Sequence, residues 1–338
     1  SPSRGLGDVY KRQNILSNAD ALFLTAIDPY GHELWRWTFP VNKLNQQTEQ
    51  LSPLSSRPTY TETENELTVK ANKRTFIFSK KDGQLKGVSV DNRKINFANG
   101  PRFIGARRAD RSLDQFYNHD DEKAKEKDRT YSEFPDAAVF TKLDVKEDGG
   151  NLVVTANYKL GNLDKAQWTI NPSGELALDY TYNFSGVVDL MGIRFDYPED
   201  QVISKRWLGA GPYRVWQNRI HGTQYDVWEN DYNDPIPGET FTYPEFKGYF
   251  GDVSWMNIQT KEGTISLTNE APDAYIGVYQ PRDGRDRLLY TLPESGISVL
   301  NVIPPVRNKV NSTDLCGPSS QPKWVNGPQT GRVIFRFM

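Results

Sequence analysis

The sequence predicts an all-β protein dominated by one large antiparallel β-sandwich. Short segments of alternating or β-branched residues recur from residue 60 to the C-terminus, separated by turn signals rich in Gly, Pro, Asn and Asp. No convincing amphipathic helix interrupts them, and no repeat of fixed length indicates a propeller or a solenoid. The 338 residues suffice for one such domain together with part of another.

A β-hairpin is expected near the N-terminus, from Ala21 to Val41. Two alternating segments flank Asp28-Pro29-Tyr30-Gly31, which is a strong turn signal. Because a two-stranded hairpin is marginal alone, we expect it to be the end of a sandwich whose other strands are missing. Residues 1–13 show no periodicity and are interpreted as an adapter-like or disordered leader, and residues 42–58 as a polar linker.

The remaining strands are expected within residues 59–338. In chain order they are 67–71, 74–79, 87–90, 151–158, 165–170, 176–184, 192–197, 250–259, 264–269, 274–279, 296–303 and 331–337. Lys81-Asp82-Gly83 and Asn171-Pro172-Ser173-Gly174 are the clearest turns between them. Residues 120–129 have helical composition but are charged all round, which favours a solvated loop.

Charge and cysteine content narrow the functional classes. Lys and Arg total 41 against 43 for Asp and Glu, so no basic stripe predicts binding to nucleic acid or to a membrane surface. No apolar run approaches the roughly 18 residues of a membrane span. The single cysteine, Cys316, excludes an intrachain disulfide and a cysteine metal cluster. Eight Trp and 17 Tyr suit stacking on carbohydrate, although large sandwiches also use aromatic residues in strands.

An ordered set of motifs resembles the C-terminal domain of family 2 glycoside hydrolases of the β-galactosidase type. Before Arg219, the set comprises Phe76-Ile77-Phe78 with Lys81-Asp82-Gly83-Gln84-Leu85, then Gly100-Pro101-Arg102-Phe103, then Trp207-Leu208-Gly209-Ala210-Gly211-Pro212. Tyr243-Pro244-Glu245-Phe246-Lys247-Gly248 follows in the family's order, whereas Gly105-Ala106-Arg107-Arg108 departs from the family pattern. The hairpin at Ala21–Val41 is similar to the last strands of the immunoglobulin-like domain that precedes this domain in the family.

The resemblance implies a galactose mutarotase-like β-supersandwich over residues 59–338, preceded at 14–41 by the end of an immunoglobulin-like β-sandwich. It further implies a retaining enzyme whose catalytic barrel lies upstream, with a β-galactoside or a related saccharide as substrate. We therefore expect no catalytic carboxylate, no metal and no cofactor in this part, and a divalent cation only in the barrel. The expected partners are the carbohydrate and the barrel of the same chain, with an oligomer left open. A periplasmic or secreted bacterial enzyme is favoured.

Trp324 is the predicted substrate contact. In the β-galactosidases a tryptophan of the C-terminal loop stacks on the sugar or the aglycone, and Trp324 stands in the matching place, after Gly317-Pro318 and before the last strand. A tryptophan borne on a loop presents an amphipathic face, although Trp324 would also suit a cover for the sandwich edge. The weaker candidates for contact with carbohydrate are Tyr213, Trp216 and Arg219. They could equally hold in place the loop that Gly209, Gly211 and Pro212 are expected to shape.

Two alternatives and several weaker signals remain. The acidic residues from Glu229 to Glu245 (Glu229, Asp231, Asp234, Glu239 and Glu245) are interpreted as turn chemistry on a wet surface and not as a catalytic pair. His32, His119 and His221 lack the spacing of zinc ligands. His221 with Glu229 would suit a mutarotase-like epimerase, an alternative that rests on fold analogy alone. The other alternative is a free-standing carbohydrate-binding β-sandwich.

Overall fold

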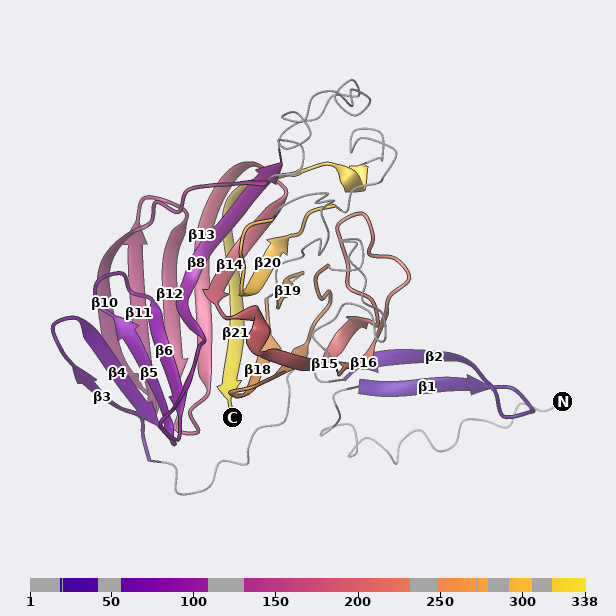
Figure 1. The fold of residues 1–338 in the computed structure, drawn as a ribbon, viewed down its shortest axis with the longest axis horizontal. Coiled ribbons are helices and arrows are strands. Elements are labelled where there is room, and N and C mark those ends of the chain that lie inside the picture. The colour runs from indigo at the N-terminus through magenta and orange to yellow at the C-terminus, as the bar shows by residue number, and fades with distance from the viewer. Residues whose placement is uncertain are drawn as a thin grey trace.

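The computed structural model describes residues 19, 21–41, 56–108, 131–231, 248–271, 273–278, 292–305 and 318–338. These residues form two large antiparallel sheets that face each other, together with a separate hairpin (Figure 1). The predicted antiparallel all-β class is therefore confirmed. Within the described ranges, no helix has the length and apolar character needed to cross a membrane.

The first sheet has nine strands in the order β10-β11-β12-β13-β21-β18-β17-β15-β16. In that order the strands are β10 (Val139–Asp148), β11 (Asn151–Lys159), β12 (Leu163–Ile170), β13 (Leu176–Val188), β21 (Lys323–Phe337), β18 (Gly263–Asn269), β17 (Trp255–Thr260), β15 (Val202–Gly211) and β16 (Gln224–Asn230). The C-terminal strand β21 thus lies at the centre of the sheet, between β13 and β18.

The second sheet has ten strands, with β19-β20-β14-β8-β6-β5-β4-β3 as its main path. These strands are β19 (Tyr275–Gly277), β20 (Ile297–Val302), β14 (Leu190–Asp196), β8 (Ala98–Arg108), β6 (Leu85–Val90), β5 (Arg74–Ser79), β4 (Glu66–Ala71) and β3 (Thr59–Glu62). β7 (Arg93–Ile95) pairs with β6, and β9 (Tyr131–Glu133) pairs with β8. Two short 3₁₀ turns, η2 (Glu199–Gln201) and η5 (Pro318–Ser320), precede β15 and β21.

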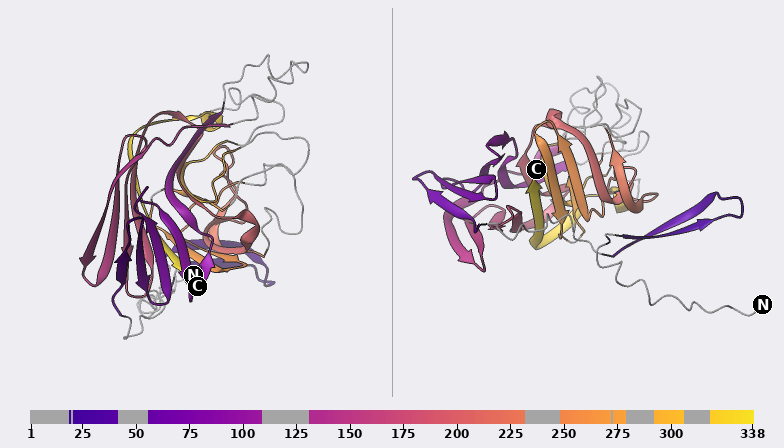
Figure 2. Two further views of the ribbon diagram at one scale, coloured as in Figure 1. Left: turned by 60° about the vertical axis from the view of Figure 1, so that its left-hand side comes forward. Right: turned by 90° about the horizontal axis from the view of Figure 1, so that it is seen from below.

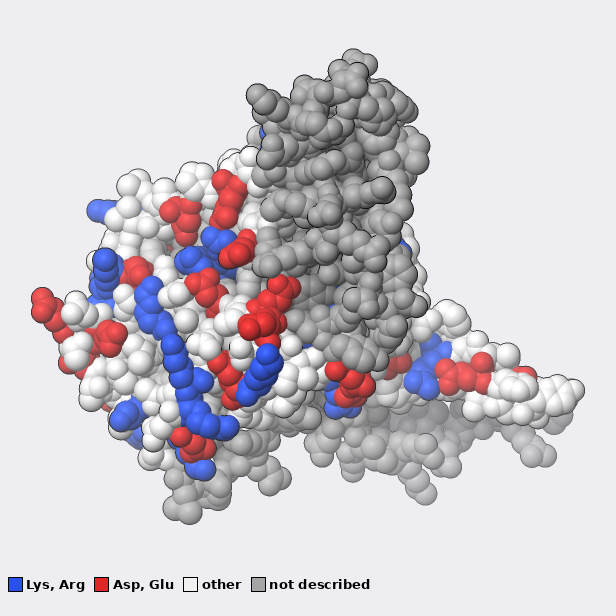
Figure 3. Space-filling view, in the orientation of Figure 1, with Lys and Arg blue, Asp and Glu red and all other residues white. Residues whose placement is uncertain are grey.

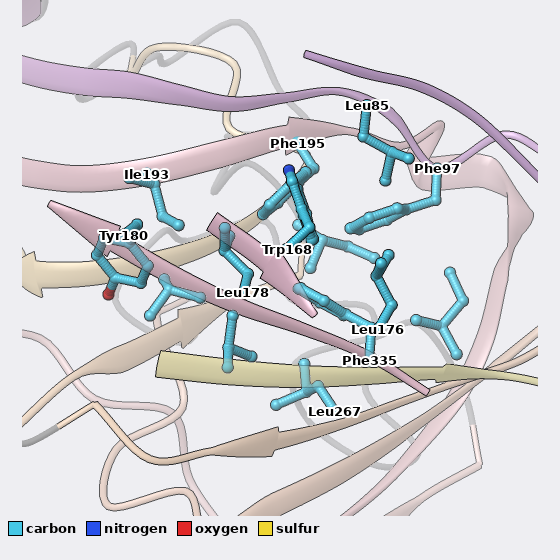
Figure 4. Close-up of a cluster of buried hydrophobic side chains, with 14 of the residues drawn as sticks. Leu85, Phe97, Trp168, Leu176, Leu178, Tyr180, Ile193, Phe195, Leu267 and Phe335 are labelled. Atoms are coloured by element: carbon cyan, nitrogen blue, oxygen red, sulfur yellow. The ribbon is translucent and has the colours of Figure 1, made fainter. Parts of the chain in front are cut away.

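The core lies between the two sheets because each strand buries alternate side chains. On β13, Leu176, Leu178 and Tyr180 point inward, whereas Asp179 and Thr181 are partly exposed on the other face. In the cluster of Figure 4, the rings of Phe97 and Phe195 stack at 4.7 Å between centroids. Burying one such side chain contributes about 1.5–3 kcal/mol, so this aromatic layer accounts for much of the cohesion between the sheets.

The expected N-terminal hairpin forms from β1 (Ala21–Ile27) and β2 (Glu33–Pro40). Asp28 closes the turn, since its Oδ1 accepts hydrogen bonds from the backbone N–H groups of Tyr30 at 2.9 Å and His32 at 2.8 Å. The hydrogen bond from the His32 amide is the largest of the effects that lower the pKa of the Asp28 carboxyl. The hairpin projects from the sandwich and meets it beside β16, where Arg36 lies 3.7 Å from Asp226 (Figure 2).

Several strand predictions were incomplete or wrong in extent. The predicted strand 74–79 is confirmed, but the last strand begins at Lys323 and not at Gly331. The predicted set lacks the strands β3, β7, β8, β9, β10, β15 and β16. On the edge strand β10 the side chains are exposed or partly buried and many are charged. The sequence there lacks the alternation of apolar residues that predicts a strand with a buried face. The predicted leader, most of the linker and residues 120–129 lie outside the described residues.

Candidate carbohydrate-contact site

Gly209 and Gly211 lie in strand β15 and do not shape a loop, so that prediction was wrong. Neither has a positive φ. Close packing requires glycine instead: a Cβ at Gly209 would lie 3.0 Å from the carbonyl oxygen of Gly251, and a Cβ at Gly211 would overlap the indole ring of Trp228. Both positions are buried. The glycines therefore let β15 fit tightly between its neighbours.

The chain leaves the sheet directly after these glycines. The Gly211–Pro212 peptide is cis, and the following residue, Tyr213, is 60% exposed. Arg214 then turns inward, where its guanidinium carbon lies 5.0 Å from the ring centroid of Phe250. Sequence reasoning did not single out Arg214, because nothing local distinguishes it from an exposed arginine. Among the weaker candidates, Tyr213 and Arg219 are exposed, and Tyr213 is the exposed aromatic side chain.

Trp216 and Arg219 hold the segment after Pro212 in place. Trp216 is fully buried, and its ring meets that of Tyr249 edge-on at 5.6 Å between centroids. The backbone N–H of Arg219 donates to the carbonyl of Trp216 at 2.8 Å, which closes the turn. Burial raises the pKa of the Tyr249 phenol and keeps it neutral. Trp216 and Tyr249 belong to a second core cluster that also contains Ile104, Leu190, Val215, Leu300 and Ile303.

The segment after Pro212 is tied to the turn that precedes β21. The side-chain amide of Gln217 donates to the carbonyl of Gln321 at 2.8 Å. Asn218 donates from Nδ2 to Oγ of Ser320 at 3.1 Å. More than one hundred residues separate the partners in sequence, and no sequence signal predicted that they meet.

Trp324 lies on a strand and not on a loop. It is the second residue of β21, is paired with Val187 of β13, and is 71% exposed. The next residue, Val325, packs against the core, so Trp324 faces away from the core on the outer side of the nine-stranded sheet. The ladder with β13 continues the strand back to Lys323. Trp324 is therefore a presented aromatic side chain on a rigid element.

Two of the acidic residues from Glu229 to Glu245 are described, Glu229 and Asp231. Glu229 lies 3.9 Å from Arg206 and Asp226 lies 3.7 Å from Arg36, both near the surface. His221 precedes β16 and Glu229 lies near its far end; Gln224 and Glu229 alone are about 16 Å apart along the strand. Asp234, Glu239, Glu245, His119, Cys316 and residues 243–247 lie outside the described residues. Within the described part, no group of three or more His, Cys, Asp or Glu could hold a metal ion.

Two cavities lie away from Trp324. One of about 540 Å³ opens between Asn96, Asp196 and Glu294, beside the 3₁₀ turn η2. Another of about 560 Å³ lies between Pro40 of the hairpin and Tyr225 and Asp252 of the sandwich. Neither is lined by a predicted site residue. On the face seen in Figure 3, acidic and basic side chains are interspersed over the sandwich.

Comparison with known proteins places these features in context. The sequence profile of the family described as beta galactosidase small chain matches residues 70–304. No curated protein matches the chain in sequence. Among solved structures, galactose 1-epimerase from Lactobacillus acidophilus NCFM is similar with a TM-score of 0.45 and 9% identity, over 84% of this chain and 99% of that one. A putative aldose 1-epimerase from Escherichia coli K12 gives a TM-score of 0.36 and 14% identity, over 83% and 99% of the two chains. These two likenesses concern the path of the chain and say nothing of activity.

Proposed function

Because the chain belongs to the beta galactosidase small chain family, we propose that it is the C-terminal accessory domain of a retaining glycoside hydrolase that acts on a β-galactoside or a related saccharide. The family match over residues 70–304 carries this proposal. Retaining hydrolysis needs two carboxyl groups about 5–5.5 Å apart, and in this proposal an upstream barrel supplies them. The present chain is catalytically inert alone and packs against that barrel.

In this proposal Trp324 contacts the carbohydrate at the entrance to the active site. Three properties support the role: the indole is 71% exposed, it stands on a strand, and the neighbouring Val325 anchors that strand in the core. An aromatic ring held in this way offers a flat face at low entropic cost. Tyr213, 60% exposed directly after the Gly211–Pro212 peptide, is a second aromatic side chain available for contact.

The experiment joins the chain to its upstream barrel and compares Trp324→Ala with the parent enzyme on oligosaccharides. A stacking contact is worth about 0.5–1.5 kcal/mol, so kcat/KM should fall about 2- to 10-fold. Tyr60→Ala is the control, because Tyr60 is 43% exposed on the edge strand β3. Unchanged kcat/KM in Trp324→Ala would refute the contact, and hydrolysis by the isolated chain would refute its inert role. Saccharide binding by the isolated chain, with no barrel encoded upstream, would favour the free-standing carbohydrate-binding module.

We also propose that the hairpin completes an immunoglobulin-like domain upstream of the sandwich. The register pairs Leu22 with Phe39, Leu24 with Trp37 and Ala26 with Trp35, so these side chains share one face. Its five large members, Leu22, Leu24, Trp35, Trp37 and Phe39, are 44–56% exposed. The other face carries Thr25, Arg36 and Thr38 together with Phe23, whose ring centroid lies 5.5 Å from the guanidinium carbon of Arg36. A hairpin with one continuous apolar face fits the inner layer of a second sheet.

A further inference from the structure

Three segments that are distant in sequence meet at Gln217. Its backbone N–H donates to the carbonyl of Pro304 at 3.0 Å, and its side-chain amide donates to the carbonyl of Gln321 at 2.8 Å. Gln217 is only 8% exposed, and Ser320, the acceptor for Asn218, is 2% exposed. The hydrogen bonds from the side chains of Gln217 and Asn218 are therefore partly buried, and partial shielding from water makes them stronger than exposed bonds.

The turn that receives these bonds is the start of the strand that carries Trp324. Gln321 is three residues before Trp324, or about 10 Å along an extended chain. The Gln321 N–H donates to the carbonyl of Pro318 at 3.2 Å, so residues 318–321 form one compact unit. Gln217 and Asn218 bind this unit through the Gln321 carbonyl and the Ser320 hydroxyl.

At this end β21 has β13 as its strand neighbour, and Val325 packs against the core. Among the described strands, residues 323–331 pair with β13 alone, because β18 reaches β21 only at Val333–Phe337. Gly327, with φ at +96°, and Pro328 lie between Trp324 and the core half of β21, and the pairing with β13 runs through both without a shift of register. The orientation of Trp324 therefore depends on the neighbouring strand β13 and on the contacts that fix the turn at residues 318–321.

We propose that Gln217 and Asn218 are positioning residues for Trp324. They fix the turn at residues 318–321 and thereby the direction in which β21 presents the indole. The segment that follows Gly211–Pro212 is in this way coupled to the carbohydrate contact without touching carbohydrate itself. That Gln217 and Asn218 position Trp324 is inferred from the hydrogen bonds alone. The consequence for catalysis rests on the proposed function of Trp324.

The structural part is tested in the 338-residue chain labelled with 5-fluorotryptophan. Trp324→Phe assigns the fluorine resonance of Trp324. Gln217→Met keeps the side-chain length but removes the donor, and Asn218→Ala removes the second donor from a partly buried site. Both variants should shift or broaden the Trp324 resonance and leave those of distant tryptophans in place. If Gln217→Met folds poorly, the resonance of Trp324 in Asn218→Ala alone decides the test.

The control is Tyr158→Phe, which removes a hydrogen bond of 3.0 Å from a partly buried side chain to the Asp82 carbonyl elsewhere in the sandwich. It should not move the Trp324 resonance. An unmoved Trp324 resonance in both Gln217→Met and Asn218→Ala overturns the positioning role, as does an equal movement in Tyr158→Phe.

The catalytic consequence is measured in the enzyme joined to its barrel. Gln217→Met should raise KM about 2- to 10-fold with kcat unchanged, which is the range given for loss of the Trp324 contact. If the resonance moves but Trp324→Ala leaves kcat/KM unchanged, the positioning role stands and the proposed carbohydrate contact fails. If Trp324→Ala lowers kcat/KM but Gln217→Met and Asn218→Ala change neither KM nor the resonance, the contact stands and the positioning role fails.

Discussion

The Nε atom of Arg74 donates a hydrogen bond of 2.8 Å to the carbonyl of Phe337, 263 residues further along the chain. From Nη1 the same guanidinium donates to the carbonyl of Ser173 at 3.0 Å. Arg74 is 8% exposed and begins β5 of the ten-stranded sheet, whereas Phe337 ends β21 of the nine-stranded sheet. One buried cation therefore joins both sheets at the end opposite to Trp324.

Replacing this arginine should weaken the whole sandwich. Arg74→Met keeps the apolar stem but leaves two carbonyl groups without their charged donor, and hydrogen bonds to charged groups contribute about 1.5–3 kcal/mol each. We expect the free energy of unfolding to fall by about 3–6 kcal/mol in urea titrations. Arg93→Met, on the exposed strand β7, is the control and should change it by less than about 0.5 kcal/mol. Equal effects of the two substitutions would contradict the bridging role.

Gly211 should tolerate no side chain. Gly211→Ala places a methyl group within the Trp228 ring, and such overpacking costs about 1–3 kcal/mol. Thermal unfolding should therefore occur at a lower temperature than in the parent chain. In Gly87→Ala the nearest atom is Ile77 Cδ1 at 3.9 Å, so this strand glycine is a matched control with little expected effect. A stable Gly211→Ala variant would show that Trp228 moves aside without cost.

Stability should fall in alkali because of buried tyrosines. Burial raises the pKa of Tyr180 above its usual value of 10.0, and it does the same for Tyr182, where Tyr180 adds a smaller effect. The folded state therefore holds these protons more tightly, so their contribution is complete below pH 10 and is lost as the pH rises further. Circular dichroism should show a cooperative loss of β-structure above pH 10.

Tyr180→Phe tests the role of the buried tyrosines by removing one phenolic oxygen atom. The Tyr180 hydroxyl is buried, and among the described groups it has no hydrogen-bond partner. Its removal should raise stability at pH 7 by about 1 kcal/mol and shift the alkaline transition to higher pH. Tyr60→Phe, on an exposed edge, should do neither. Destabilisation in Tyr180→Phe at pH 7 would indicate that the hydroxyl is satisfied.

The apolar face of the hairpin should promote association of the isolated chain. Leu24→Ser combined with Trp37→Ser removes a cross-strand pair whose members are 56% and 44% exposed. We expect less binding of an apolar dye and less self-association in sedimentation experiments. In the complete enzyme the same double substitution should instead lower stability, because there the rest of the immunoglobulin-like domain would cover this apolar face. Tyr30→Ser, at the exposed turn, is the control, and a similar response from it would contradict the proposed interface.

Much of the sandwich could be predicted because several of its strands, such as β11 and β12, alternate between buried and more exposed residues. The pattern from Leu176 to Tyr182 indicates one buried face without any knowledge of the neighbouring strand. β15 was missed for the opposite reason. Gly209 and Gly211 are typical of turns, and only the approach of Gly251 and the Trp228 ring explains why a strand needs them. The extent of β21 was underestimated because its first half pairs along β13, which no local pattern reports.

The sequence by itself determined the antiparallel all-β class, the N-terminal hairpin and the family, because alternation, turn residues and ordered motifs are all local properties. It also marked Trp324, although on a loop. Only the tertiary structure decided that Trp324 stands on the outer face of a strand, and that Gln217 and Asn218 reach the turn before it. The physical reason is distance along the chain: hydrogen bonds between residues about a hundred positions apart depend on how whole sheets pack, and a polar residue carries no local sign of the partner it will meet.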